Sequence, residues 1–271
     1  MESKNYYLYR LFFRRFISVF FNNSVWILKL LKASVFNISV ESKEYLVVRD
    51  KKLIYIINSK AACSSIKRAL IESVASKEIS VNNNSDIHKC ARQLGYQSNH
   101  LNKEERSWYK FTFVRDPFKR LVSLYVNKFE DREKLLNIGF FQYQKYLGGI
   151  LHQNMSFEDF VKFISKIPDK FAERHFVSQS FLLTSKREKI NYIGKVENIE
   201  EDYKVIREEF GLKNNLRNSN RSPEYDYRDY YTPEILNLVY DRYKRDIVEF
   251  GYDREHKELK AYIEQRNNDI E

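Results

Sequence analysis

Two short strand-like runs, the first of them continuously apolar and each followed by a loop and a helical pattern, most constrain how this chain folds. Residues 53–57 read Leu-Ile-Tyr-Ile-Ile, and residues 110–114 form a second run that ends in Phe-Val. Short runs that are apolar on both faces are typical of strands buried in a parallel sheet. After the first run, Ile66, Leu70 and Val74 share one face of a helix. We therefore expect a three-layer α/β fold with a central parallel sheet and helices on both faces.

Local signals place the other elements along the chain. Ser156 opens a capping box ahead of a helix, with Asp159 where Glu is usual. Thr232 before Pro233 is a helix N-cap, and Gly251 ends that helix. The predicted strands lie at residues 45–48, 53–58, 110–114 and 191–193, and the predicted helices at 64–74, 118–129, from 157 onward and 234–250.

Half of the net charge of +10 lies in the first 40 residues, which hold six basic side chains and one acidic one. Residues 11–36 are apolar but interrupted by polar side chains that include Asn22, Lys29 and Lys32. Each Lys near the centre of a membrane span costs about 2.5–3.5 kcal/mol. We therefore predict an N-terminal amphipathic helix on an anionic membrane surface; a helix docked on the protein's own core and a marginal signal anchor are the alternatives. The predicted domains are a membrane-associating segment at residues 1–40 and one α/β domain at residues 41–271.

Composition narrows the function classes. Two cysteines, Cys63 and Cys90, do not make a disulfide framework, which favours a reducing compartment. The basic excess beyond the first 40 residues is mild, and no nucleic-acid recognition motif accompanies it, so we expect no nucleic-acid partner. No cluster has the spacing of metal ligands, so we expect no metal.

A loop of small residues connects the first apolar run to its helix. Residues 58–67 read Asn-Ser-Lys-Ala-Ala-Cys-Ser-Ser-Ile-Lys. At a helix N-terminus such a loop aims backbone N–H groups and the positive end of the helix dipole at one point, which suits an anion. Lys60 adds a mobile charge, and Ser64 and Ser65 add hydroxyl donors. The nucleotide P-loop pattern is absent. Alone, this loop is equally well explained as a capped helix with an incidental lysine.

A second constellation follows the second apolar run. Arg115 leaves that run, and Ser123 lies eight residues further on, two turns into the next helix. A guanidinium fork and a hydroxyl at this separation can converge on one phosphate. The stretch from Val114 to Ser123 resembles the Val-Arg-x-Pro-Phe-x-Arg-Leu-x-Ser motif of the carbohydrate sulfotransferases that use 3′-phosphoadenosine-5′-phosphosulfate (PAPS), namely sulfotransferase family 2, the branch that includes the Golgi 4-O-sulfotransferases.

Three further motifs carry the same resemblance. Residues 59–67 are similar to the family's Pro-Lys-x-x-Cys-Thr-x-x-Lys, with Ser59 in place of Pro and Ser64 in place of Thr. Residues 194–197 look like its Gly-Lys-x-Glu, and residues 230–252 look like its C-terminal signature. The four motifs occur in order, which makes the resemblance specific.

The resemblance implies a P-loop-like fold and transfer of a sulfuryl group from PAPS to a hydroxyl of a carbohydrate acceptor. By position, the first loop would hold the 5′-phosphosulfate, and Arg115 with Ser123 would hold the 3′-phosphate. Lys60 would also neutralise charge on the bridging oxygen. The residues assigned to PAPS in this way are Lys60, Ala61, Ala62, Cys63, Ser64, Ser65, Arg115, Ser123 and Arg221.

The family typically has a histidine some way before the strand that ends in Arg115. Of the five histidines, His88 precedes Arg115 by 27 residues and is the predicted general base. His100, His175 and a carboxylate are the alternatives. The stretch from His175 to Gln179 resembles a family stretch that we expect to shape the acceptor site.

Two other classes stay open, a P-loop-type nucleotide-dependent kinase and a non-catalytic membrane- or polyanion-binding protein on the same fold. The kinase lacks support because no Gly-Lys-Ser/Thr pattern and no acidic strand end for Mg²⁺ are present. The implied acceptor is a polysaccharide, a glycolipid or a similar carbohydrate, with peripheral membrane contact through residues 11–36. We expect a cytoplasmic, membrane-associated protein, or a Golgi membrane protein if the N-terminus acts as a signal anchor.

Overall fold

The computed structural model of this chain describes residues 28, 30–36, 39, 41–74, 84–130, 155–183, 188–216 and 225–269. The chain divides into two compact units, one of residues 1–40 and 124–172 and one of residues 41–123 and 173–271. We call the second the sheet unit, because it contains every described strand, and the first the helical unit. The predicted division into residues 1–40 and 41–271 stays a prediction.

Five strands form one mixed sheet in the sheet unit, in the order β3-β1-β2-β4-β5. Strands β2, β4 and β5 run parallel, as the apolar runs predict. Strand β1 is antiparallel to both β2 and β3, so the expectation of a wholly parallel sheet was wrong there. The reason is a tight turn at Arg49–Lys51, which sends the chain straight back along β1. The strands are β1 (Tyr45–Val48), β2 (Leu53–Ile56), β3 (Gln97–Ser98), β4 (Tyr109–Val114) and β5 (Tyr192–Lys195).

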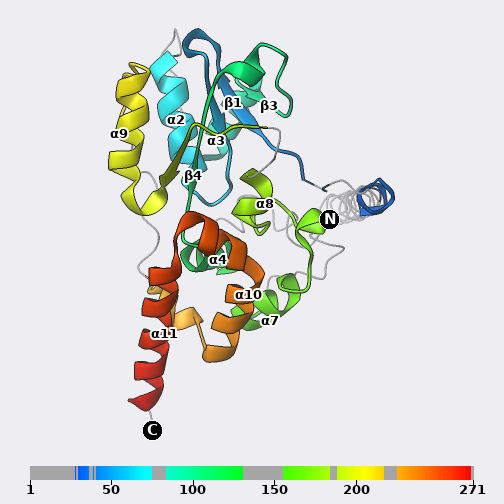
Figure 1. Cartoon of the computed structure of the whole chain (residues 1–271), viewed down its shortest axis with the longest axis vertical. Helices are drawn as coiled ribbons and strands as arrows, with labels where there is room; N and C mark the ends of the chain where they lie inside the picture. The colour runs from blue at the N-terminus through cyan, green and yellow to red at the C-terminus, as the bar shows by residue number, and fades with distance from the viewer. Residues whose placement is uncertain are drawn as a thin grey trace, which may run out of the picture. The chain divides into compact units, whose positions relative to one another are not determined.

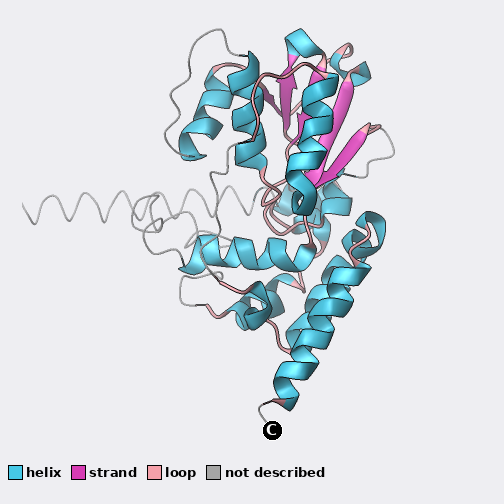
Figure 2. Ribbon diagram, turned by 90° about the vertical axis from the view of Figure 1, so that its left-hand side faces the viewer, coloured by secondary structure: helices cyan, strands magenta, loops and turns pink. Residues whose placement is uncertain are grey.

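Helices flank the sheet, as Figure 2 shows. The helix predicted at 118–129 begins at Pro117 as α4 and continues as a π-helical turn over Val126–Glu130. The α-helices in the described part of the chain include α2 (Cys63–Val74), α3 (Asn84–Gln93), α4 (Pro117–Tyr125), α7 (Phe157–Ile164), α8 (Gln179–Leu183), α9 (Ile199–Glu209), α10 (Pro233–Phe250) and α11 (Asp253–Asn268).

One face of the sheet packs against α2, α3 and α9. Alternate strand residues such as Tyr55 and Phe111 join Leu70 of α2 in the core on this face, and all three are fully buried. Figure 1 shows α9 and α2 beside each other at the sheet. On the opposite face of β2, Ile54 and Ile56 are also fully buried. Burial on both faces explains why this strand reads as a continuous apolar run.

The capping signals form as predicted. The Thr232 hydroxyl oxygen accepts a hydrogen bond from the Ile235 backbone N–H at 3.3 Å, and Gly251 ends α10 with a φ of 65°. In the helical unit, the Ser156 hydroxyl oxygen accepts from the Asp159 backbone N–H at 3.0 Å. The same hydroxyl donates to the Asp159 carboxylate at 2.8 Å. These caps fix where α10 and α7 begin.

The helical unit holds an aromatic cluster and part of the N-terminal segment. The ring of Tyr125 lies 5.2 Å from that of Phe157 and 5.9 Å from that of Phe160, centroid to centroid. Residues 28 and 30–35 are helical. The rest of the amphipathic helix predicted at 11–36 lies outside the described residues. No helix within the described part of the chain is long and apolar enough to span a bilayer.

Gly194 gives the sheet a testable close contact. It pairs with Phe113 across β4 and β5, and a Cβ at this position would lie 2.5 Å from the Phe113 ring. Because Phe113 is fully buried, its ring has little room to move. We predict that Gly194→Ala lowers the free energy of unfolding by about 1–3 kcal/mol in urea titrations.

The matched control is Val205→Ala on α9, where the side chain is exposed and the expected change is within about 0.5 kcal/mol. A Gly194→Ala protein as stable as the control would contradict the contact between β5 and the Phe113 ring.

Candidate functional site

The loop between β2 and α2 has an unusual backbone. Lys60 and Ala62 both adopt positive φ values, 65° and 54°, although neither is glycine. Between them, Ala61 is fully buried. Positive φ in residues other than glycine costs free energy and clusters at functional sites. The next residue, Cys63, begins α2, so the backbone N–H groups of the first helical turn face the same loop.

Arg115 and the Lys60 loop lie together in the sheet unit. Both follow parallel neighbouring strands, β2 and β4, whose carboxyl ends share one edge of the sheet. Nη1 of Arg115 lies 3.4 Å from the Lys60 backbone oxygen, at the edge of hydrogen-bonding distance. Lys60 and Arg115, which are 55 residues apart in the sequence, therefore lie next to each other in the sheet unit. Such proximity is compatible with one ligand that carries two anionic groups.

Gln179, the first residue of α8, holds these two segments in register. Its side-chain oxygen accepts hydrogen bonds from the Arg115 backbone N–H at 3.0 Å and from the Asn58 side-chain amide at 2.9 Å. Its side-chain NH₂ donates to the Arg115 carbonyl at 2.8 Å. The Asn58 amide also donates to the Phe113 carbonyl at 2.9 Å. Gln179 and Asn58 are fully buried, so these bonds form away from water.

Asp246 of α10 fixes Gln179 in turn. Its carboxylate accepts from the backbone N–H groups of Gln179 and Ser180, at 2.8 and 2.7 Å. Sequence reasoning missed this carboxylate. The available signal was position: Asp246 falls three residues after Tyr243 and one before Ile247, on the buried face of α10. An acid on an apolar helix face indicates a buried hydrogen-bonding role.

The buried guanidinium of Arg120 was also missed. It donates to three backbone oxygens, those of Ser59 at 3.0 Å, Val177 at 2.9 Å and Arg174 at 3.3 Å. Arg120 thereby ties the residue before Lys60 to the segment that precedes α8. All three acceptors in these bonds are backbone carbonyl oxygens.

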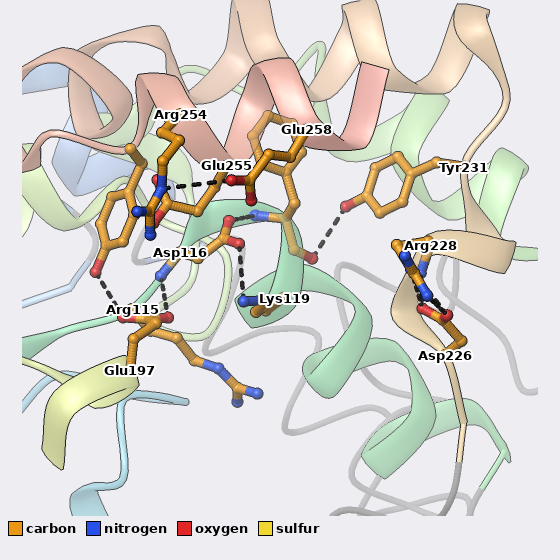
Figure 3. A network of polar contacts seen from close by, with 12 residues as sticks. Arg115, Asp116, Lys119, Glu197, Asp226, Arg228, Tyr231, Arg254, Glu255 and Glu258 are labelled. Atoms are coloured by element: carbon orange, nitrogen blue, oxygen red, sulfur yellow. Dashed lines mark hydrogen bonds and ion pairs between the residues drawn. The ribbon is translucent and has the colours of Figure 1, made fainter. Parts of the chain in front are cut away.

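The residue after Arg115 is held by a carboxylate (Figure 3). The Asp116 backbone N–H donates to Glu197 at 2.9 Å, and the Tyr252 hydroxyl donates to the other oxygen of Glu197 at 3.0 Å. Asp116 itself accepts from the Phe118 N–H at 2.8 Å. Figure 3 shows the Arg115 guanidinium pointing away from the Asp116 carboxylate. Glu197, from the Gly-Lys-x-Glu stretch, therefore orients the start of α4.

Burial makes Asp116 an unusual acid. Its side chain is fully buried, and burial raises the pKa of its carboxyl to about 6, with Lys119 and the Phe118 N–H acting in the opposite direction. The Lys119 ammonium lies 3.8 Å away. A carboxyl with this pKa changes charge close to neutral pH.

His88, the predicted general base, lies on α3 against the start of α2. Lys67 Nζ lies 2.9 Å from His88 Nδ1, and Ser64 Oγ lies 3.2 Å from His88 Nε2. Burial, together with the charges of Lys67 and Arg92, lowers the pKa of His88 to about 4. The ring is therefore neutral at pH 7. A lysine ammonium only donates, so Nδ1 accepts from Lys67 and Nε2 carries the proton that faces Ser64. The assignment of His88 as the base stays a prediction.

The remaining predicted residues divide by location. Ser64, Cys63 and Ser65 lie in the first turn of α2, and Ser123 lies in α4, partly exposed. Arg221 lies outside the described residues. Among the residues that the structure describes, no group of three or more His, Cys, Asp or Glu side chains gathers as a metal site would require.

Comparison with known proteins identifies relatives of one kind. A family model described as "Sulfotransferase family" matches residues 43–253. Carbohydrate sulfotransferase 11 of Mus musculus is 25% identical over 242 residues, which cover 78% of this chain and 67% of that protein. Carbohydrate sulfotransferase 14 of Danio rerio is 27% identical over 254 residues, covering 85% and 66%. Carbohydrate sulfotransferase 10 of Xenopus laevis is 24% identical over 184 residues, covering 59% and 52%. No solved structure matches the chain.

The raised pKa of Asp116 predicts a pH-dependent stability. The folded-state pKa of about 6 exceeds the value of 3.8 for a free Asp, so the cost of keeping the buried carboxylate charged is fully present above about pH 6 and absent below about pH 4. Asp116→Asn should therefore raise the free energy of unfolding at pH 7.5 by about 1–3 kcal/mol, and this gain should disappear near pH 4.

The matched control is Asp241→Asn, an exposed position on α10, where no such pH-dependent gain is expected. An Asp116→Asn protein that is less stable than the wild type at pH 7.5 would show that the Lys119 ion pair outweighs the burial of the charge.

Proposed function

Since this chain belongs to the sulfotransferase family, whose model covers residues 43–253, we propose that its site binds PAPS and transfers the sulfuryl group to a carbohydrate hydroxyl. The observation that carries the proposal is the meeting of Arg115 with the Lys60 loop at one edge of the sheet. PAPS is anionic at both ends, with a phosphosulfate on one side of its ribose and a phosphate on the other. Two cationic groups held together by buried hydrogen bonds match that charge distribution.

The donor set of the loop fits a phosphosulfate. Lys60 supplies a cation, and Ser64 with Ser65 supplies hydroxyl groups in the first turn of α2. The helix N-terminus adds backbone N–H groups and the positive end of its dipole. All of these groups donate and none is acidic, so the loop favours a ligand that brings only acceptors. Arg115 and Ser123 are the proposed ligands of the 3′-phosphate, and Arg221 is proposed to lie near the nucleotide.

Sulfuryl transfer requires positioning and charge stabilisation more than covalent help from the protein. In the proposed reaction the acceptor oxygen attacks sulfur in line with the departing bridging oxygen, as in phosphoryl transfer. Lys60 neutralises the negative charge that grows on that bridging oxygen. A general base removes the proton of the acceptor hydroxyl, and His88 is the sequence-based candidate for it. The strained backbone of the Lys60 loop supports charge stabilisation by that loop, because a fixed backbone holds the donors in place before the reaction.

The finer features of the fold and the acceptor belong to the same proposal. We propose a P-loop-like three-layer arrangement around β2, β4 and β5, and a carbohydrate acceptor, which the names of the related sulfotransferases support. We further propose that residues 11–36 form an amphipathic helix that attaches a cytoplasmic protein to a membrane surface. If these residues act as a signal anchor, the protein would instead lie in the Golgi membrane. Exposed Leu31, Val35 and Phe36 in the described end of that segment support the membrane contact.

Binding of the product nucleotide tests the proposal. We predict that 3′-phosphoadenosine-5′-phosphate (PAP), without Mg²⁺, raises the melting temperature of the wild-type protein. Arg115→Ala removes charge-assisted hydrogen bonding to a phosphate. A net loss of about 1.5–3 kcal/mol means that PAP should bind roughly 10- to 150-fold more weakly by calorimetry. Arg115→Lys keeps the charge but loses the planar fork and should fall between the two.

The matched control is Arg254→Ala on α11, whose side chain is 80% exposed and forms ion pairs with Glu255 and Glu258 of its own helix. It should bind PAP like the wild type. A protein that is stabilised by Mg-ATP but not by PAP would instead support a kinase, and equal PAP binding by Arg115→Ala and the wild type would contradict the proposed site.

A further inference from the structure

A second histidine near the site has the arrangement that a general base needs. Nδ1 of His175 lies 2.7 and 2.9 Å from the two carboxylate oxygens of Glu173. A carboxylate only accepts, so Nδ1 carries a proton and the neutral ring keeps its lone pair on Nε2. Within the part of the chain that the structure describes, nothing is hydrogen-bonded to Nε2 of His175. The side chain of His175 is 27% exposed and that of Glu173 is 10% exposed, so part of the imidazole is accessible while the carboxylate is mostly shielded.

The geometry of Glu173 fixes the ring as well as its tautomer. The same carboxylate accepts the backbone N–H of His175 at 2.8 Å. Two bonds from one carboxylate to one residue restrict how the imidazole can rotate. This is the pattern in which a carboxylate orients a catalytic histidine and stabilises the imidazolium that forms when the ring takes a proton.

The His175 segment is attached to the Lys60 loop. The guanidinium of Arg120 binds the backbone oxygen of Ser59, one residue before Lys60, and that of Arg174, one residue before His175. Lys60 and His175 therefore each follow a residue whose carbonyl oxygen binds the same buried guanidinium. Further along, Gln179 ties the same segment to Asn58 at the start of the loop.

Electrostatic coupling gives the same location independently. A proton on His175 lowers the pKa of His88, after burial and the charges of Lys67 and Arg92. The charge of Arg174 likewise lowers the pKa of Lys67 on α2, after burial. The residues beside the loop, on α2 and α3, therefore lie within electrostatic reach of the His175 segment.

His88 offers less to an acceptor hydroxyl. Its one lone pair, on Nδ1, accepts from the Lys67 ammonium at 2.9 Å, and its N–H faces Ser64. To remove a proton from the acceptor, His88 would first have to break the bond to Lys67 and leave that buried cation without this partner. Its lowered pKa, about 4, also makes it a weak base. These contacts suit a residue that positions Ser64 in the loop.

From these contacts we infer that His175, oriented by Glu173, is the general base of the proposed sulfuryl transfer, and that His88 is a positioning residue of the Lys60 loop. The inference rests on the proposed function. The acceptor O–H proton passes to Nε2 of His175 while the acceptor oxygen forms its bond to sulfur. The bond between sulfur and the bridging phosphate oxygen breaks with its electron pair, and PAP departs. The proton on His175 is then released to water.

The test is transfer of ³⁵S from labelled PAPS to a panel of hexose, N-acetylhexosamine and hexuronate oligosaccharides, with kcat measured on the one that the wild type sulfates fastest. His175→Asn is expected to lower kcat by roughly 10²- to 10⁴-fold, the usual contribution of general base catalysis. The affinity for PAP should stay within about twofold, because no proposed PAP ligand changes. Glu173→Gln should lower kcat by a smaller factor, with an unchanged KM for PAPS.

His88→Asn is the matched comparison and should give the opposite result. It is expected to weaken PAP binding while it keeps a kcat well above that of His175→Asn. The pH profile separates catalysis from structure: the fall in kcat toward acidic pH, seen in the wild type and in His88→Asn, should be absent in His175→Asn between roughly pH 5 and 8. Glu173 and Arg174 beside His175, and His88 on α3, are neighbouring charged or titratable groups in this comparison.

Each outcome decides between the two histidines. If His175→Asn folds and retains kcat within threefold or so of the wild type, or if His88→Asn alone abolishes turnover with PAP binding intact, the inference is overturned. Should His175→Asn fail to fold, Glu173→Gln carries the same test through its kcat and KM. A wild-type protein that binds no PAP and labels no oligosaccharide would contradict the proposed function itself, and the inference would fall with it.

Discussion

The side-chain amide of Gln179 is the contact on which the candidate site depends. This amide accepts from the backbone N–H of Arg115 and the side chain of Asn58, and it donates to the backbone oxygen of Arg115. It therefore joins the ends of two parallel strands, β2 and β4. Asp246 holds the backbone of Gln179 by accepting the first N–H groups of α8. The two cationic groups at the sheet edge repel each other, and the buried amide hydrogen bonds of Gln179 and Asn58 keep the segments that carry them in place. An anionic ligand then finds donors that are already positioned.

Carboxylates near the site orient backbone and imidazole groups. Glu197 binds the N–H of Asp116, Asp246 binds the start of α8, and Glu173 binds His175. Each of these three carboxylates thus has a hydrogen-bond partner on the protein. Asp116 accepts the Phe118 N–H, and its second oxygen is buried without a hydrogen bond; burial accordingly raises the pKa of this acid to about 6.

Sequence patterns predicted the elements that local chemistry decides. The two strand-like runs are β2 and β4, and α10 begins after Thr232 and ends before Gly251. The predicted loop ahead of α2 is also present, and the structure adds that Lys60 and Ala62 in it are strained. The antiparallel direction of β1 was not predicted, because pairing between strands depends on the turn at Arg49–Lys51 and on partners distant in the sequence.

The contacts that assemble the site escaped sequence reasoning for a similar reason. Asp246 meets Gln179 across 67 residues, and Arg120 meets Ser59 across 61, and no periodicity encodes such pairs. Histidine spacing alone likewise favoured His88 over His175. The difference between the two lies in their partners, an ammonium for one and a carboxylate for the other, which only the folded arrangement reveals.

A crystal structure of the protein with bound PAP would test the central claim most directly. The account predicts one nucleotide whose 5′-phosphate contacts the Lys60–Ser65 loop and whose 3′-phosphate contacts the Arg115 guanidinium, with Gln179 still bonded to Asn58 and Arg115. A nucleotide that touches one of these two groups and not the other, or that binds elsewhere on the chain, would contradict it.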